Sequence, residues 1–155
     1  MKWRELAGTP CSVARSLAIV GDRWTILILR DAFLRTRRFD DFHAQLGITR
    51  HLLANRLAKL VKLGVMSKLA YQERPPRYEY RLTEMGRDWY RVQLALVAWG
   101  DKWLSGESGA PVEFVHQDCG HKFQPLMVCS ECREPLDPRA ITPMAGPGLR
   151  VRKSP

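Results

Sequence analysis

Cysteine and histidine side chains gather in the last third of the chain. Cys119, Cys129 and Cys132 lie there, with His116 and His121 on either side of the first cysteine. A Cys-x-x-Cys pair combined with a second pair of soft ligands is how small tetrahedral zinc ribbons are built. The pattern therefore predicts zinc bound by Cys119, His121, Cys129 and Cys132, with His116 as the alternative fourth ligand.

Two other interpretations of this segment stay open. Cys129 and Cys132 are spaced as a dithiol redox pair would be, and the segment could also form a metal-free β-hairpin with incidental cysteines. A segment this short has little core of its own, so a metal ion would be a reasonable stabiliser. Zinc is the one cofactor that the sequence suggests.

A second group of candidate residues is basic. The net charge of the chain is +9, and 19 of its 25 Lys and Arg residues lie in residues 1–104 together with 10 of its 16 Asp and Glu. The whole positive excess therefore belongs to the first two thirds of the chain. A basic domain attracts polyanions, of which duplex DNA is the most common.

The stretch from Thr49 to Leu63 separates apolar from basic side chains at helical spacing. Leu53, Leu57 and Leu60 fall on one face, Thr49 is a suitable N-cap, and Gly64 ends the pattern. A helix of this kind fits the major groove of B-DNA. Its candidate DNA-binding residues are Thr49, Arg50, His51, Asn55, Arg56 and Lys59. Arginine suits guanine, asparagine suits adenine, and hydroxyl and ammonium groups suit phosphate oxygens.

Strand-like runs at residues 65–71 and 78–82 follow this helix. The loop between them contains two adjacent prolines flanked by Arg74 and Arg77, and this composition predicts a stiff basic wing that contacts the minor groove or its phosphates. Arg38 precedes a predicted short helix and is a further phosphate-binding candidate. Together with predicted helices at residues 12–21, 22–34 and 39–46, the order of elements is that of a winged helix–turn–helix. Within the second of these helices, Trp24, Leu27, Ile28 and Leu34 form the expected inward stripe.

Residues 83–104 have the pattern of one long helix capped by Thr83. A heptad-like seam runs along it, formed by Met85, Trp89, Val92, Leu96, Trp99 and Trp103. Such a seam predicts a homodimer, although a wide core-facing stripe would give the same spacing. We expect a mainly α, α+β fold with two parts: a DNA-binding and dimerisation domain over residues 1–104, and a small β-rich segment with an irregular tail over residues 105–155.

Several blocks of this sequence resemble those of the HxlR-type winged-helix regulators. The matching blocks lie at residues 11–17, 21–30, 37–42 and 73–83. The resemblance implies a homodimer that binds a palindromic operator as repressor or activator, and it implies dimerisation through the first and last helices of this region. It also makes Cys11 a candidate redox sensor, since some members of the family sense oxidants at this position; a thiol packed as a small apolar side chain is the alternative.

The sequence therefore predicts a transcription regulator, most simply a repressor, that binds double-stranded DNA and responds to a small molecule or to thiol oxidation. The alternative is a winged-helix protein-interaction module that does not bind DNA. An enzyme is not expected, because no phosphate-binding glycine loop or catalytic triad pattern is present. The sequence offers no membrane span and no signal-peptide core, so we expect a cytoplasmic protein.

Overall fold

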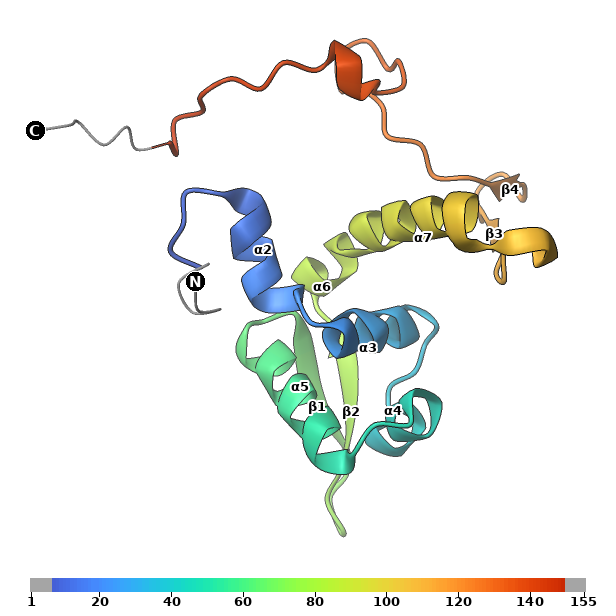
Figure 1. The fold of residues 1–155 in the computed structure, drawn as a ribbon. Helices are drawn as coiled ribbons and strands as arrows, with labels where there is room; N and C mark the ends of the chain where they lie inside the picture. Colours follow the sequence, from blue (N-terminus) through green and yellow to red (C-terminus); the bar gives the residue numbers. More distant parts are fainter. Residues whose placement is uncertain (1–6, 150–155) are drawn as a thin grey trace, which may run out of the picture. The chain divides into compact units, whose positions relative to one another are not determined.

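The computed structural model describes residues 7–149 (Figure 1), which divide into two units. The first ends at Tyr90 and the second spans Arg91–Leu149. The helix that begins at Tyr90 therefore lies in the second unit, together with the cysteine-rich segment. Within residues 7–149, no helix combines the length and apolarity that crossing a bilayer requires.

The helices of the first unit are α2 (Ser12–Val20), α3 (Arg23–Phe33), α4 (Phe39–Leu46), α5 (Arg50–Lys62) and α6 (Glu84–Asp88). Their ends follow from local capping. The side chains of Asp22, Thr49 and Thr83 accept hydrogen bonds from backbone amides at the starts of α3, α5 and α6. Gly47 ends α4 in the left-handed conformation with φ of 61°. The caps predicted at Thr49 and Thr83 are confirmed.

The wing is an antiparallel hairpin of β1 (Met66–Gln72) and β2 (Arg77–Leu82), whose register shifts between Ala70 and Gln72. A third segment extends the sheet beside β2. The Tyr80 amide donates to the Arg37 carbonyl at 2.7 Å, and Arg38 pairs with Glu79 in an antiparallel bridge. The residues that precede α4 are therefore fixed to the wing.

The core of the first unit lies where α3, α4, α5 and β1 meet. Its fully buried apolar residues are Ile28, Leu29, Phe42, Leu53, Leu57 and Leu60, with Met66 from β1. Tyr80, Leu82 and Trp89 pack against this cluster. The leucine face predicted for α5 is therefore the face that the fold buries, and this leaves the opposite face of α5 for other contacts.

The second unit consists of α7 (Tyr90–Leu104), η1 (Gly106–Ser108), a hairpin of β3 (Phe114–Val115) and β4 (Lys122–Phe123), and η2 (Pro138–Ala140). Phe114 faces Phe123 across the hairpin, with ring centroids 6.3 Å apart. No residue from 105 to 149 is buried. This segment therefore has strands and turns but no hydrophobic core.

Two details of the expected fold are wrong. The single helix predicted over residues 83–104 is divided at Trp89 into α6 and α7, and the Trp89 side chain packs against the core of the first unit. Leu34, expected on the inward stripe of α3, lies at the C-cap and is 60% exposed. In both cases the apolar residues have helical spacing, but the pattern continues past the point where the helix ends.

Candidate nucleic-acid interface

The exposed side of α5 carries a short polar line. Arg50 and His51 occupy the first turn, Asn55 follows one turn later, and all three are exposed. The Asn55 side-chain nitrogen lies 3.0 Å from His51 Nε2, so these two side chains are already oriented toward each other. The first residues of a recognition helix are those that reach base edges. The exposed line therefore lies at the end of α5 from which bases can be read.

Thr49 stands immediately before this line. Its hydroxyl accepts a hydrogen bond from the Leu52 amide at 3.3 Å. A hydroxyl that accepts one bond still has its own proton to donate. Thr49 can therefore cap α5 and donate to a phosphate oxygen at the same time.

Arg56 is engaged inside the protein. Its Nε donates to Asp22 Oδ1 at 2.9 Å, and both side chains are about 30% exposed. Partial burial opposes ionisation of Asp22, but hydrogen bonds from the Thr25 hydroxyl, Arg56 and the Thr25 amide, with the charge of Arg56, together lower the pKa of the Asp22 carboxyl. The carboxylate that caps α3 is thereby also the partner that holds Arg56 away from the exposed line.

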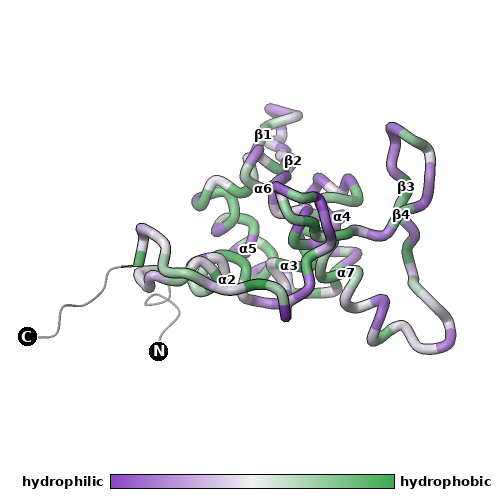
Figure 2. Tube along the Cα trace, turned by 90° about the horizontal axis from the view of Figure 1, so that it is seen from above, coloured by the Kyte–Doolittle hydropathy of each residue, from purple (hydrophilic) through white to green (hydrophobic). Residues whose placement is uncertain are grey.

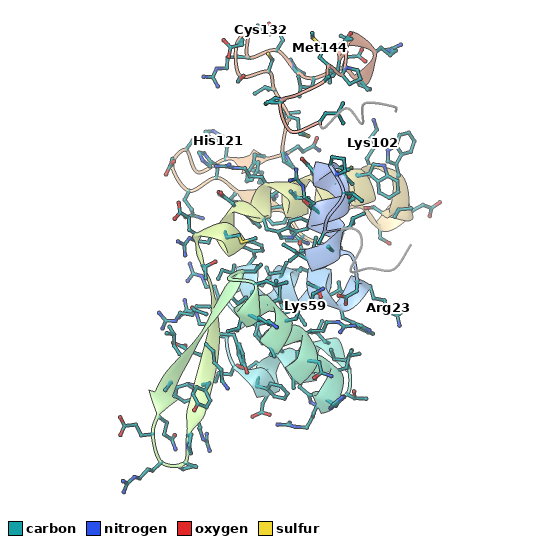
Figure 3. The ribbon with its side chains drawn as sticks, turned by 90° about the vertical axis from the view of Figure 1, so that its left-hand side faces the viewer. Arg23, Lys59, Lys102, His121, Cys132 and Met144 are labelled. Atoms are coloured by element: carbon teal, nitrogen blue, oxygen red, sulfur yellow. The ribbon has the colours of Figure 1, made fainter. Side chains whose placement is uncertain are left out.

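Lys59 is engaged in a similar way. Its ammonium group donates to the carbonyl oxygens of Ala18 and Ile19, each at 3.0 Å, in the last turn of α2 (Figure 3). Those carbonyls have no partner within the helix, and a positive charge at this end also interacts favourably with the helix dipole. The structure thus places two of the six residues predicted on α5, Arg56 and Lys59, in contacts between helices.

The start of α4 carries charges of both signs. Arg50 bonds to the exposed carboxylate of Asp40 at 2.8 Å, and its guanidinium lies 4.8 Å from the centre of the Phe39 ring. Asp41 adds a second carboxylate to the same helix turn. These acidic groups oppose the phosphate site suggested for the N-terminus of α4. Arg38 itself is exposed and stacks over the Tyr71 ring at 5.0 Å.

The wing presents its own basic groups. Arg74 lies in the exposed turn between the strands and Arg77 begins β2, and the hydrophilic colour of this turn is visible in Figure 2. A polar depression of about 480 Å³ lies between the wing and the starts of α4 and α5. Arg38, Arg50 and Arg77 all line it. Three guanidinium groups that are distant in the sequence are therefore gathered around one surface.

Comparison with known proteins gives this arrangement a family. Residues 19–108 match the family model described as HxlR-like helix-turn-helix. The chain belongs to the HxlR-like helix-turn-helix family. An HTH-type transcriptional regulator of Mycobacterium tuberculosis (strain CDC 1551 / Oshkosh) is 43% identical over 141 residues, which are 91% of this chain and 89% of the relative. The expected resemblance is confirmed, and this HxlR-family member is a transcriptional regulator and not an enzyme.

Solved structures agree with the family assignment. PA1607, described as a candidate transcription factor, is similar to this chain with a TM-score of 0.78 and 33% identity, over 97% of this chain and 99% of that one. The redox regulator HypR in its reduced form has a TM-score of 0.55 and 28% identity, over 59% and 92% of the two chains. The expected winged-helix α+β fold is confirmed by these likenesses.

The residues predicted for dimerisation divide into two groups. On α7, Val92, Leu96, Trp99 and Trp103 are between 44% and 64% exposed, and Met85 on α6 is half exposed. Trp89 differs, because it packs against the core of its own unit. In the HxlR-family regulator, α7 therefore presents an uncovered apolar face, while Trp89 already has an intramolecular role.

Cys11, the redox candidate, is an exposed residue at the N-cap of α2. Its side chain makes no capping hydrogen bond. An exposed thiol is accessible to oxidants, which is the first requirement for sensing.

The cysteines and histidines of the second unit lie in two separate turns. Cys119 and His116 are in the turn of the β3–β4 hairpin, whereas Cys129 and Cys132 are in the next turn. Hydrogen bonds from the backbone amides of Cys132 and Glu131 lower the pKa of the Cys129 thiol. Over residues 7–149, no three Cys, His, Asp or Glu side chains are gathered as a ready metal site.

A groove of about 680 Å³ lies within the second unit between α7 and the β3–β4 hairpin. Val97 and Ala98 from α7, with Phe114 and Phe123 from the hairpin, supply apolar lining. The ion pair between Lys122 and Glu113 lies at its edge, 2.5 Å apart. This volume is in the range of small-molecule pockets. The sequence alone does not reveal the groove, because its two walls are brought together only by the fold.

Proposed function

We propose that this regulator binds a specific duplex DNA sequence as a homodimer, with α5 in the major groove and the wing on the flanking backbone. The observation that carries the proposal is the exposed line of Arg50, His51 and Asn55 at the start of α5. The leucine face beneath it is fully buried, so the line has a rigid support. Arginine can donate in pairs to guanine and asparagine can pair with adenine.

The roles within the interface follow from what each side chain contacts. Arg50 and Asn55 are assigned to base edges, and Thr49, Arg74 and Arg77 to phosphates. Arg50 must exchange its exposed partner Asp40 for DNA, which costs little because an ion pair between two well-solvated groups is weak. Arg56 and Lys59 are assigned to the fold and not to DNA.

Homodimerisation is supported by the uncovered apolar faces of two helices. Trp99 and Trp103 on α7 are 58% and 64% exposed, and Val13 and Leu17 on α2 are 67% and 42% exposed. An exposed apolar face on a helix is often covered by a partner in the assembled protein. A twofold dimer would place two copies of α5 on successive major grooves, about 34–36 Å apart, and would read a palindrome.

Repression is the simplest consequence of this binding. A dimer that occupies an operator overlapping a promoter excludes the polymerase without needing a further activation surface. Two observations support a response to signals. The groove beside α7 has the size of an effector pocket, and the exposed Cys11 gives a thiol that an oxidant can reach.

Selection of random duplex DNA by the full chain, followed by sequencing, tests the proposal. The expected product is an inverted repeat with half-sites about one helical turn apart. The Arg50→Ala and Asn55→Ala double variant should lose this enrichment, whereas Arg23→Ala, at the start of α3, should keep it. Without enrichment above the salt-sensitive background, the protein-interaction module becomes the better interpretation.

The dimer is tested separately by analytical ultracentrifugation. The wild-type chain should sediment as a dimer at micromolar concentration, and Trp99→Glu should shift it toward the monomer by placing a charge on the apolar face. A wild-type monomer under these conditions would contradict the dimer. A reporter gene placed behind the selected operator gives the sign of regulation.

A further inference from the structure

The two turns of the second unit carry side chains of the metal-ligand type at the same spacing. Residues 116–121 read His-x-x-Cys-Gly-His and residues 129–134 read Cys-x-x-Cys-Arg-Glu. His116 therefore corresponds to Cys129 and Cys119 to Cys132. His121 corresponds to Glu134.

The backbone of the two turns repeats as well. The His116 amide donates to the His121 carbonyl at 2.9 Å, and the Gly120 amide donates to the His116 carbonyl at 2.7 Å. In the second turn, the Cys129 amide donates to the Glu134 carbonyl at 2.9 Å, and the Arg133 amide donates to the Cys129 carbonyl at 3.0 Å.

The fifth position of each turn has the same unusual conformation. Gly120 has a φ of 71° and Arg133 a φ of 64°. A positive φ is uncommon for a residue other than glycine, so its presence at Arg133 shows that the turn requires it. The two segments are thus two copies of one structural turn, with a ligand-type side chain at the first and fourth positions of each.

The first turn already has the spacing of a metal-binding pair. Cys119 Sγ lies 3.5 Å from His116 Nδ1. A tetrahedral zinc ion with ordinary Zn–S and Zn–N bond lengths separates its sulfur and nitrogen ligands by about 3.5 Å. The other ring nitrogen, His116 Nε2, lies 3.6 Å from the Asp118 carboxylate. A carboxylate in this place is the usual partner that orients a metal-binding histidine.

In the second turn, Cys129 and Cys132 occupy the first and fourth positions, as His116 and Cys119 do in the first turn. Each turn therefore supplies half of a tetrahedral ligand set. The segment that contains them has no buried residue from 105 to 149, which leaves it without the core that would otherwise stabilise it.

We propose that His116, Cys119, Cys129 and Cys132 of one chain bind a single Zn²⁺, two ligands from each turn. Residues 124–126, which connect β4 to the backbone pairing around the second turn, must bring the two turns together when the metal binds. Binding releases the three thiol protons, so that three thiolates and one neutral imidazole complete the site. Thiolate ligands favour zinc over the hard cations magnesium and calcium.

The repeat also decides between the two histidines. His121, expected as the fourth ligand from its proximity to Cys119 in the sequence, occupies the position of Glu134 in the second turn. His116 occupies the position of a cysteine. The geometry of the turn therefore replaces His121 by His116 in the ligand set.

The test uses the full-length chain, purified without chelators. Zinc is measured by mass spectrometry, reactive thiols are counted with and without a chelator, and Co²⁺ is substituted for its spectrum. We expect one zinc per chain, one reactive thiol (Cys11) in the zinc form and four after chelation, and Co²⁺ absorption typical of three sulfurs and one nitrogen.

Variants assign the ligands. His116→Ala and Cys132→Ser should weaken zinc binding at least 10-fold, and Asp118→Asn should weaken it about 10- to 100-fold through loss of the orienting carboxylate. His121→Ala and Cys11→Ser are the matched controls and should keep one zinc. Circular dichroism and DNA binding of each variant show whether the first unit remains folded.

Three results would overturn the proposal. Loss of zinc in His121→Ala with retention in His116→Ala would refute the ligand assignment. Half a zinc per chain would show a site shared between two chains. A zinc-free protein with a Cys129–Cys132 disulfide would establish the redox pair instead. DNA binding is measured independently, so failure of the zinc site leaves the DNA-binding proposal unaffected.

Discussion

Replacement of Lys59 by methionine separates stability from DNA recognition in this regulator. Methionine keeps most of the apolar stem and removes the ammonium group. That group donates to the carbonyls of Ala18 and Ile19 at the end of α2, each at 3.0 Å. Hydrogen bonds that involve a charged group are worth about 1.5–3 kcal/mol, and a cation at a helix C-terminus adds about 0.3–1 kcal/mol.

The expected loss is smaller than the sum of these contributions. The contact lies beside a small surface pocket of about 160 Å³, so water can hydrate the two carbonyls once the ammonium group is gone. We therefore expect the free energy of unfolding to fall by about 1–2 kcal/mol. Urea unfolding at one fixed protein concentration measures this change. An unchanged m-value, the slope of unfolding free energy against urea concentration, would show that the folded and unfolded states are otherwise the same.

The matched variant is Arg50→Ala, on the exposed side of the same helix. It should change the free energy of unfolding by less than about 0.5 kcal/mol, because its partner Asp40 is well solvated. Arg50→Ala should also reduce by about 1–3 kcal/mol the difference in binding free energy between the preferred base pair and a substituted one. In fluorescence anisotropy, Lys59→Met should keep the operator preference and the salt dependence of the wild type. The contrary result is unchanged stability in Lys59→Met, with the slope of log affinity against log salt concentration reduced by about 1. That result would show that Lys59 contacts a phosphate and would refute this reasoning.

Three further predictions concern other parts of the first unit. Gly86→Ala should destabilise the protein by about 1–3 kcal/mol in urea unfolding, because the added Cβ would collide with the Val65 carbonyl; a neutral result would mean that α6 shifts freely. The lowered pKa of Asp22 means that its ionised form stabilises the fold above the ordinary value of 3.8, and that this contribution is lost as the pH falls through the lowered value. Asp22→Asn should therefore flatten the acid limb of a stability–pH curve, and an unchanged limb would contradict the pairing. Arg74→Ala with Arg77→Ala should reduce the salt slope of DNA binding by about 2 while preserving the preferred sequence; a changed sequence would place the wing on bases.

The parts of the fold that depend on neighbouring residues were predictable from the sequence. The caps at Asp22, Thr49 and Thr83 and the left-handed turn at Gly47 are set within four residues, so their side-chain types identify them. The buried leucine face of α5 follows from spacing alone. The opposite face of α5, and thus the candidate site, was located by the same argument.

The role of each basic residue on α5 was not predictable in this way. Arg56 bonds to a residue 34 positions away, and Lys59 bonds to carbonyls 40 and 41 positions away. Helical spacing places both beside the exposed line, and only the packing of α2 and α3 against α5 shows that they are engaged. The signal that was available is Asp22, an acidic residue just before α3 that could pair with a basic residue elsewhere in the chain.

The break at Trp89 was missed for a related reason. The apolar spacing from Met85 to Trp103 continues without interruption, and Asp88 and Tyr90 are not helix breakers. The helix ends because Trp89 is packed against a core assembled from earlier elements. Similarly, the correspondence between His116 and Cys129 rests on backbone hydrogen bonds and on the φ of Arg133, which the sequence does not display.

On α5, some side chains hold the helix in the fold and others are exposed, and this separation has a consequence for changing the DNA sequence that the protein binds. Arg56 and Lys59 fasten the helix to α3 and α2, and the leucines fasten it to the core, so the helix keeps its place whatever its outer residues are. The positions left free for a new operator are 50, 51, 54, 55 and 58, two of which are now alanine. A library that varies these five positions and preserves the rest should yield folded variants with new sequence preferences.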